Sequence, residues 1–118
     1  MLATVLFLIV GVVNLLPVVG ASSASRLRTL YGIPLDDPNL IILMRHRAVL
    51  LGIVGAILVA AAFVPSLRAL AVAAGLVSML SFVLVAHLVG EYDAELRRVI
   101  LIDLGASVVL IGASLASL

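Results

Sequence analysis

The stretch AVLLGIVGAILVAAAFV, residues 48–64, decides the fold because it is a long apolar run without a single charge. After Pro65-Ser66 a second apolar run follows, LRALAVAAGLVSMLSFVLVA at residues 67–86, in which Arg68 is the only charged residue. An α-helix needs about 20 mainly apolar residues to cross a bilayer. Proline donates no backbone hydrogen bond and restricts the residue before it. Pro65 therefore predicts a tight turn between two membrane helices.

The same apolar length occurs twice more, once on each side of this pair. We expect spans at about 2–20, 40–64, 67–89 and 96–118, all within one domain. The chain is 65% hydrophobic and 11% charged, with a mean hydropathy of +1.43. Soluble domains carry about 25% charged residues. The sequence thus predicts an all-α fold, an integral membrane four-helix bundle.

The first span has an alternative interpretation as a secretory signal peptide, because Val19 and Ala21 resemble a small-residue cleavage site. However, no basic residue precedes its apolar stretch, and the stretch is longer than the apolar core of a signal peptide. We therefore expect a membrane helix. Further along, Asp37 before Pro38 fits the N-cap and first position of the second helix.

Arginine placement predicts the orientation. All seven basic residues are arginine, and basic residues in short loops stay on the cytoplasmic side of a membrane. Arg68 alone lies on one side, whereas six lie on the other: Arg26, Arg28, Arg45, Arg47, Arg97 and Arg98. The expected location is a bacterial inner membrane, crossed several times, with both termini outside.

Ionisable residues inside a span are costly unless they are paired or hydrated, so they mark functional sites or internal ion pairs. The outer half of the expected bundle is nearly free of charge, and no continuous polar path crosses it as a channel would require. The cytoplasmic half holds a group that we call the polar cup: Arg45, His46, Arg47, His87, Glu91 and Asp103. We predict these six as ligand-binding residues.

Arg45 and Arg47 are two residues apart and point to roughly opposite faces of a helix, so only one of them can face inward. We expect one to pair with Asp103 or Glu91 and the other to reach lipid phosphates. Asp103 lies about 12 Å into the last span and must be paired or carry a proton. The arginine cluster is explained either by anchoring at the interface or by a site for an anionic head group.

Three classes of function remain. The first is a lipid- or lipophile-binding module or an accessory subunit, with membrane lipids, a lipophilic small molecule, a homo-oligomer or a larger membrane complex as partners. The alternative is an intramembrane acid–base enzyme, an isomerase or cyclase, with Asp103 or Glu91 as proton donor and His46 or His87 as relay. The third and least favoured is a small transporter.

Several classes are excluded or unsupported. Cysteine is absent, so thiolate chemistry is excluded. Two histidines without a clear third ligand do not predict a metal, and no cofactor motif is present. The net charge of +1 does not predict a basic surface that would bind nucleic acid.

Small residues allow helices to approach closely in lipid. Three packing faces are expected on this basis: Gly52, Ala56 and Ala60 on the second span, Gly75, Ser78 and Ser81 on the third, and Gly105 and Gly112 on the fourth. Asn14 in the first span is expected to form an interhelical hydrogen bond.

Residues 30–82 contain two recognisable pieces, LMRHRAVL at 43–50 and AFVP at 62–65. This part of the chain resembles a group of small bacterial four-helix membrane proteins without assigned function. The resemblance implies a shared fold and no activity. Members are sometimes labelled phosphopantetheine adenylyltransferase, but that soluble nucleotide-binding enzyme carries an H-x-G-H phosphate motif that has no match here.

Overall fold

The computed structural model describes residues 1–16 and 37–118, and all regular structure in these two ranges is helical. The elements are α1 (Leu2–Leu15), α3 (Pro38–Phe63), the short 3-10 helix η2 (Pro65–Leu67), α4 (Arg68–Val89) and α5 (Ala94–Ala116). The all-α prediction is confirmed, and the last three expected spans agree with α3, α4 and α5 to within a few residues. The end of the first expected span, from residue 17, and the arginines Arg26 and Arg28 lie outside the described residues.

Local sequence explains where the helices begin and end. Asp37 caps α3, its carboxylate accepting a 2.9 Å hydrogen bond from the Asn39 N–H, and Pro38 is the first helical residue, as predicted. Asp93 caps α5 in the same way. Gly90 ends α4 with φ of 83°, a left-handed conformation that glycine adopts without strain.

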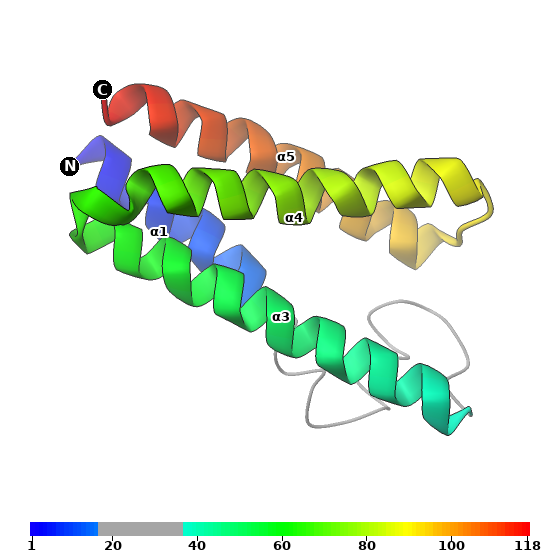
Figure 1. Cartoon of the computed structure of the whole chain (residues 1–118). Coiled ribbons are helices and arrows are strands. Elements are labelled where there is room, and N and C mark those ends of the chain that lie inside the picture. Colours follow the sequence, from blue (N-terminus) through cyan, green and yellow to red (C-terminus); the bar gives the residue numbers. More distant parts are fainter. Residues whose placement is uncertain (17–36) are drawn as a thin grey trace.

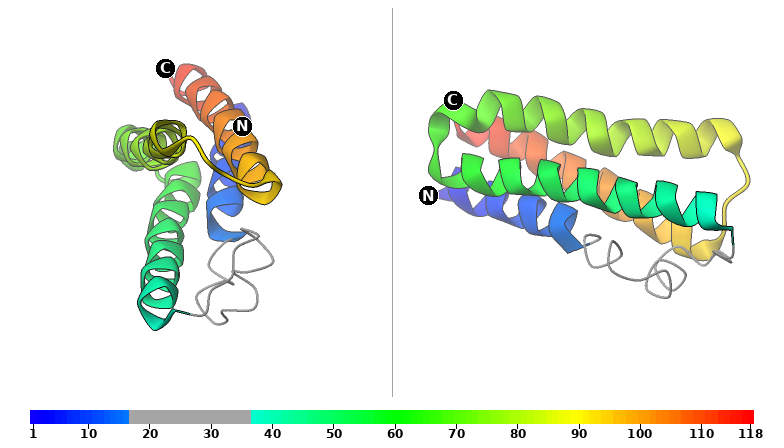
Figure 2. Two further views of the ribbon diagram at one scale, coloured as in Figure 1. Left: turned by 90° about the vertical axis from the view of Figure 1, so that its right-hand side faces the viewer. Right: turned by 60° about the horizontal axis from the view of Figure 1, so that its bottom comes forward.

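The four helices form a ring in which α1 packs against α3 and α5, and α4 packs against the same two helices (Figure 2). The two chain ends and the α3–α4 turn lie together at one end of the bundle, which we call the termini end (Figure 1). The start of α3 and the α4–α5 turn lie at the other, the loop end. The described part of α1 lies alongside only the half of α3 that is near the termini end. Toward the loop end, α3 and α4 diverge.

The core lies where all four helices meet, in the half that contains α1. Each helix contributes large side chains that are almost completely buried: Phe7, Val10, Leu58, Met79 and Leu110. Asn14, buried on α1, donates hydrogen bonds to the Val10 carbonyl oxygen at 2.9 Å and to the Met79 Sδ on α4 at 3.7 Å. The expected interhelical hydrogen bond of Asn14 is therefore confirmed.

Two of the predicted packing faces are wrong. The Gly52-Ala56-Ala60 series does not form the contact with α1, because Ala56 is exposed and the buried Gly55 meets α1 instead. On α5, a Cβ placed on Gly105 or Gly112 would meet no atom within 4 Å. These helices are apolar on all sides, so the spacing of small residues leaves the rotation of each helix undetermined.

Gly75 on α4 does serve close packing, as expected. A Cβ at this position would lie 2.6 Å from Leu110 Cδ2 of α5. Of the two serines predicted on the same face, Ser78 is half-buried and Ser81 is exposed. The close α4–α5 approach therefore uses only part of the predicted face.

The outward surface is strongly apolar. Large side chains such as Leu43, Val77, Leu88 and Val108 are each about two-thirds exposed or more. Three helical segments, α3, η2 with α4, and α5, are long and apolar enough to cross a membrane, whereas the described α1 is shorter. The fold is thus all-helical, with dimensions and surface suited to a membrane.

Candidate functional site

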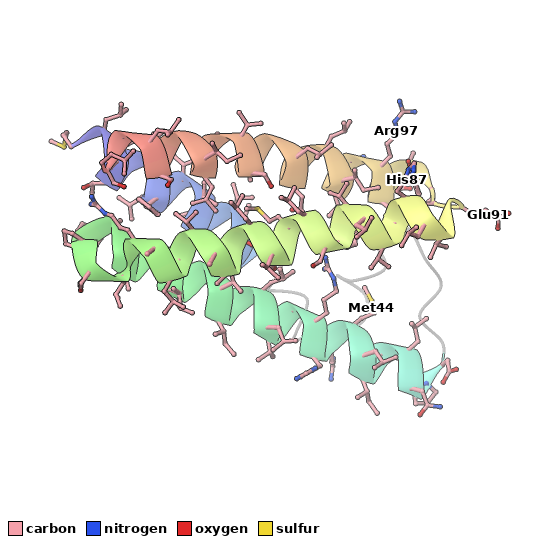
Figure 3. The ribbon with its side chains drawn as sticks, turned by 45° about the horizontal axis from the view of Figure 1, so that its top comes forward. Met44, His87, Glu91 and Arg97 are labelled. Atoms are coloured by element: carbon pink, nitrogen blue, oxygen red, sulfur yellow. The ribbon has the colours of Figure 1, made fainter. Side chains whose placement is uncertain are left out.

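All six residues of the predicted polar cup lie in the half of the bundle toward the loop end, but they do not converge. Figure 3 shows His87 and Glu91 toward the α4–α5 turn, Arg97 near the start of α5, and Met44 on α3. Four of the six are exposed: Arg45, His46, His87 and Glu91. Only Arg47 and Asp103 are half-buried.

Arg47 is the arginine that faces the neighbouring helices. Its guanidinium carbon lies 4.5 Å from the centroid of the Phe82 ring on α4, which is cation–π geometry. Arg47 therefore connects α3 to α4. The expected pairing of one of the two arginines with Asp103 or Glu91 stays a prediction.

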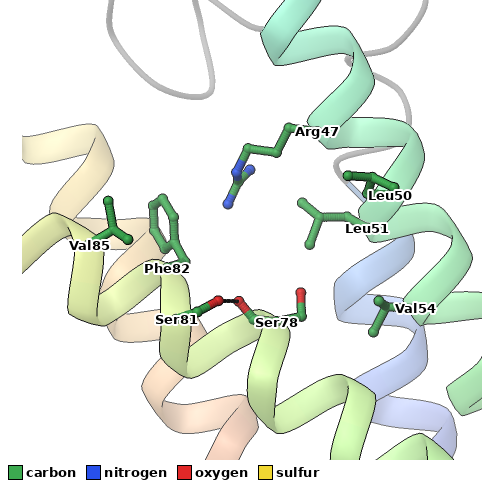
Figure 4. Close-up of a pocket in the computed structure, with 8 residues that line it drawn as sticks. All are labelled: Arg47, Leu50, Leu51, Val54, Ser78, Ser81, Phe82 and Val85. Atoms are coloured by element: carbon green, nitrogen blue, oxygen red, sulfur yellow. Dashed lines mark hydrogen bonds between the residues drawn. The ribbon is translucent and has the colours of Figure 1, made fainter.

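Arg47 lies at one end of a pocket between α3 and α4, which we call the α3–α4 groove (Figure 4). Its volume is about 300 Å³, and its lining comprises Arg47, Leu50, Leu51 and Val54 of α3 with Ser78, Ser81, Phe82 and Val85 of α4. Most of these lining residues are apolar, and among the described ones only Arg47 is charged. The Ser81 hydroxyl donates to the Ser78 carbonyl oxygen at 3.1 Å. Apolar walls with few polar groups are typical of a site for a small lipophilic molecule.

Among the residues that line the groove, Phe82, Leu51 and Val54 were not predicted from the sequence. The chain has only three phenylalanines, and Phe82 follows the small residues Ser78 and Ser81 on the same helix. The position of Phe82 opposite Arg47 depends on how α3 and α4 pack against each other, which the sequence alone does not predict.

At the termini end, Arg68 has a structural role that its place in the sequence did not reveal. Its Nε donates to the Ala61 carbonyl oxygen at 2.9 Å, and its Nη2 donates to the Ala62 carbonyl oxygen at 3.0 Å and to Thr4 Oγ1 at 3.5 Å. The guanidinium carbon also lies 5.4 Å from the centroid of the Phe7 ring. The last carbonyls of a helix lack intrahelical partners, so Arg68 completes the end of α3 and joins it to α1.

Within residues 1–16 and 37–118, no three side chains of His, Cys, Asp or Glu come together in a way that could hold a metal ion. Asp103 is not part of the groove lining, and His46 and His87 are exposed on different helices. Therefore none of the proton donors and relays considered from the sequence is among the described residues that line the groove.

No protein-family model, curated protein or solved structure matches this chain. The resemblance to small bacterial four-helix membrane proteins stays a prediction. The features of this bundle that bear on its function are the α3–α4 groove and the apolar outward surface.

Proposed function

We propose that the chain is an integral membrane protein whose α3–α4 groove holds a lipophilic molecule. The observation that carries this proposal is the groove itself, an apolar pocket with one half-buried arginine at its end, Arg47. The most concrete role is that of a lipid- or lipophile-binding module.

Membrane insertion is supported by the apolar outward faces of α3, α4 and α5 and by their lengths. An exposed apolar surface of this extent is unfavourable in water but not in lipid. Helices also satisfy their own backbone hydrogen bonds, as a bilayer interior requires. In the proposed orientation the loop end, with Arg45, Arg47, Arg97 and Arg98, faces the cytoplasm of a bacterial cell, and the termini end faces outward.

The groove has a charged end at Arg47 and a mainly apolar remainder, an arrangement that suits an amphiphilic ligand. Phe82 lies seven residues before Val89, so the polar end of the groove is about 10 Å from the loop end of α4. Ser78 and Val54 line the part nearer the middle of the bundle. A lipid-like molecule entering from the surrounding bilayer would place its head group near Arg47 and its apolar chain along Val54.

The enzymatic alternative gains no support from the geometry. Asp103 does not line the groove, and Glu91, His46 and His87 are exposed. An acid–base mechanism requires the donor within hydrogen-bond reach of the substrate. The groove therefore favours binding over catalysis.

The test is purification of the full chain in a mild detergent, followed by mass spectrometry of the retained small molecules. Ser81→Phe places a ring in the groove, and Val77→Phe adds the same ring to an exposed position of α4 outside the groove. We expect one lipophile to be enriched with the wild type and with Val77→Phe and to be lost from Ser81→Phe. Equal retention by both variants would contradict the proposal. The same purification tests the role of an accessory subunit, because a stable protein partner would be retained as well.

A further inference from the structure

A second pocket lies at the termini end of the bundle, between the start of α4 and the end of α5. We call it the termini pocket, and its lining includes Arg68, Ala69 and Val72 of α4 with Ser114, Ser117 and Leu118 at the end of α5. Its volume is about 270 Å³, several times the roughly 30 Å³ that one water molecule occupies in the liquid. None of these residues lines the α3–α4 groove, so the two pockets are separate.

The Arg68 guanidinium keeps hydrogen-bond donors that the bundle does not use. Its Nε and Nη2 donate to carbonyl oxygens at the end of α3 and to Thr4, whereas its Nη1 takes part in none of these hydrogen bonds. Arg68 is half-buried, and no fully buried side-chain nitrogen or oxygen of the described residues lacks a hydrogen-bond partner. The two N–H groups of Nη1 are therefore accessible, on a side chain that lines the pocket.

The positive charge of Arg68 has no carboxylate partner among the described residues, because its hydrogen bonds go to carbonyl and hydroxyl oxygens. The described acidic side chains lie at the start of α3, in the α4–α5 turn or in the first half of α5: Asp37, Glu91, Asp93, Glu95 and Asp103. The carbonyls at a helix end carry about half a negative charge, which offsets the arginine only in part. The termini pocket therefore favours an anion.

Two serine hydroxyls complete the polar side of the pocket. The Ser117 hydroxyl donates to the Ser114 carbonyl oxygen at 2.8 Å, so its own oxygen can still accept a hydrogen bond. The Ser114 hydroxyl has no hydrogen bond to another described residue and can donate. Arginine N–H groups and hydroxyls are strong donors to phosphate oxygens, and the Ser117 oxygen suits a ligand hydroxyl beside such a phosphate.

Membrane insertion, as proposed above, places the termini end at the level of the lipid head groups. Resting on that insertion but not on the α3–α4 groove, we infer that the termini pocket binds a phospholipid with an anionic phosphate diester and an uncharged hydroxyl head group, as in phosphatidylglycerol. Arg68 Nη1 and the Ser114 hydroxyl donate to the phosphate oxygens, and the Ser117 oxygen accepts from the head-group hydroxyl. A zwitterionic lipid fits less well, because no acidic side chain lines the pocket to receive its ammonium group.

Three lipids with the same acyl chains test the inference: phosphatidylglycerol, phosphatidylcholine and diacylglycerol, which lacks the phosphate. Native mass spectrometry of the full chain in neutral detergent gives a dissociation constant for each lipid. We expect the wild type to bind phosphatidylglycerol about tenfold more tightly than either of the other two. Ser117→Glu places a carboxylate in the pocket, where it pairs with Arg68 and repels phosphate, and should abolish this preference. The uncharged Ser117→Gln is the matched control and should keep it.

A second pair of variants blocks the pocket without a change of charge. Ala69→Phe fills the pocket and should also abolish the preference. Ala56→Phe, at an exposed position of α3 outside both pockets, should keep it. Ser81→Phe closes the α3–α4 groove and should leave the preference for phosphatidylglycerol intact as well.

Equal affinity of the wild type for the three lipids would overturn the inference. A loss in Ser117→Glu without a loss in Ala69→Phe would do the same, because overall charge would then explain the preference. If Ser81→Phe loses the preference and Ala69→Phe keeps it, the head group binds at the groove, so the inference fails while the proposed function stands. Displacement of phosphatidylglycerol by equimolar inorganic phosphate would identify free phosphate, and not a lipid, as the ligand.

Discussion

Gly11 of α1 and Gly55 of α3 face each other at backbone contact distance. A Cβ on Gly55 would lie 2.9 Å from the Gly11 carbonyl oxygen, and a Cβ on Gly11 would lie 3.1 Å from the Gly55 carbonyl oxygen. Neither backbone can move away from such an added Cβ without separating the two helices. This pair therefore sets the distance between α1 and α3, the closest approach that small residues permit in lipid.

We expect Gly55→Ala to destabilise the protein by about 1–3 kcal/mol, the usual cost of overpacking a tight contact. The added methyl group meets Leu15 Cγ at 2.8 Å as well as the Gly11 carbonyl oxygen. Gly112→Ala is the matched control, because its methyl group meets no atom within 4 Å and alanine favours a helix. Thermal unfolding in detergent measures both. A Gly55→Ala variant as stable as Gly112→Ala would show that α1 and α3 are not in this contact.

Arg68→Gln should destabilise the termini end by about 1.5–3 kcal/mol, because hydrogen bonds from a charged donor to the Ala61 and Ala62 carbonyl oxygens are lost. Arg68→Lys should recover only part of this, since an ammonium group lacks the planar fork of arginine. Arg97→Gln removes an exposed arginine and serves as the control. Comparable unfolding temperatures for the Arg68 and Arg97 variants would argue against a structural role for Arg68.

Phe82→Leu keeps the groove apolar but removes the aromatic ring beneath the Arg47 guanidinium. Cation–π contacts contribute about 0.5–2 kcal/mol, so we expect the affinity for the retained lipophile to fall several-fold. Phe63→Leu, at an exposed site at the end of α3, should have no effect on affinity. The readout is the amount of lipophile bound per purified chain at limiting ligand. Unchanged binding by Phe82→Leu would remove Phe82 from the site.

The absence of cysteine makes the orientation directly testable. Ser66→Cys lies in the turn at the termini end, and Tyr92→Cys lies in the turn at the loop end, both at exposed positions. On intact cells, a membrane-impermeant maleimide should label Ser66→Cys and not Tyr92→Cys, with both labelled after lysis. The reverse labelling would invert the topology predicted from the arginines.

The positions of the helices were predictable from the sequence because they follow from local chemistry. Asp37 and Pro38 begin α3, Pro65 separates α3 from α4, and the apolar length between such signals defines each helix. The concentration of most arginines at one end of the bundle was equally predictable from the sequence. The candidate site was predictable only in part: of the six residues predicted from the sequence, Arg47 lines the groove, whereas Asp103 does not and His46 and His87 are exposed.

The sequence by itself thus determined the three long apolar helices α3, α4 and α5, their ends, and the end of the bundle at which most of the described charges lie. Only the tertiary structure decided how each helix is rotated: that Arg47 and not Arg45 meets Phe82, and that Gly55 and not Ala56 meets α1. The physical reason is that a helix meant for lipid is apolar on its buried and its outward faces alike. Its sequence then lacks the polar stripe that reveals orientation in a soluble protein, and only the contacts between helices distinguish one face from another.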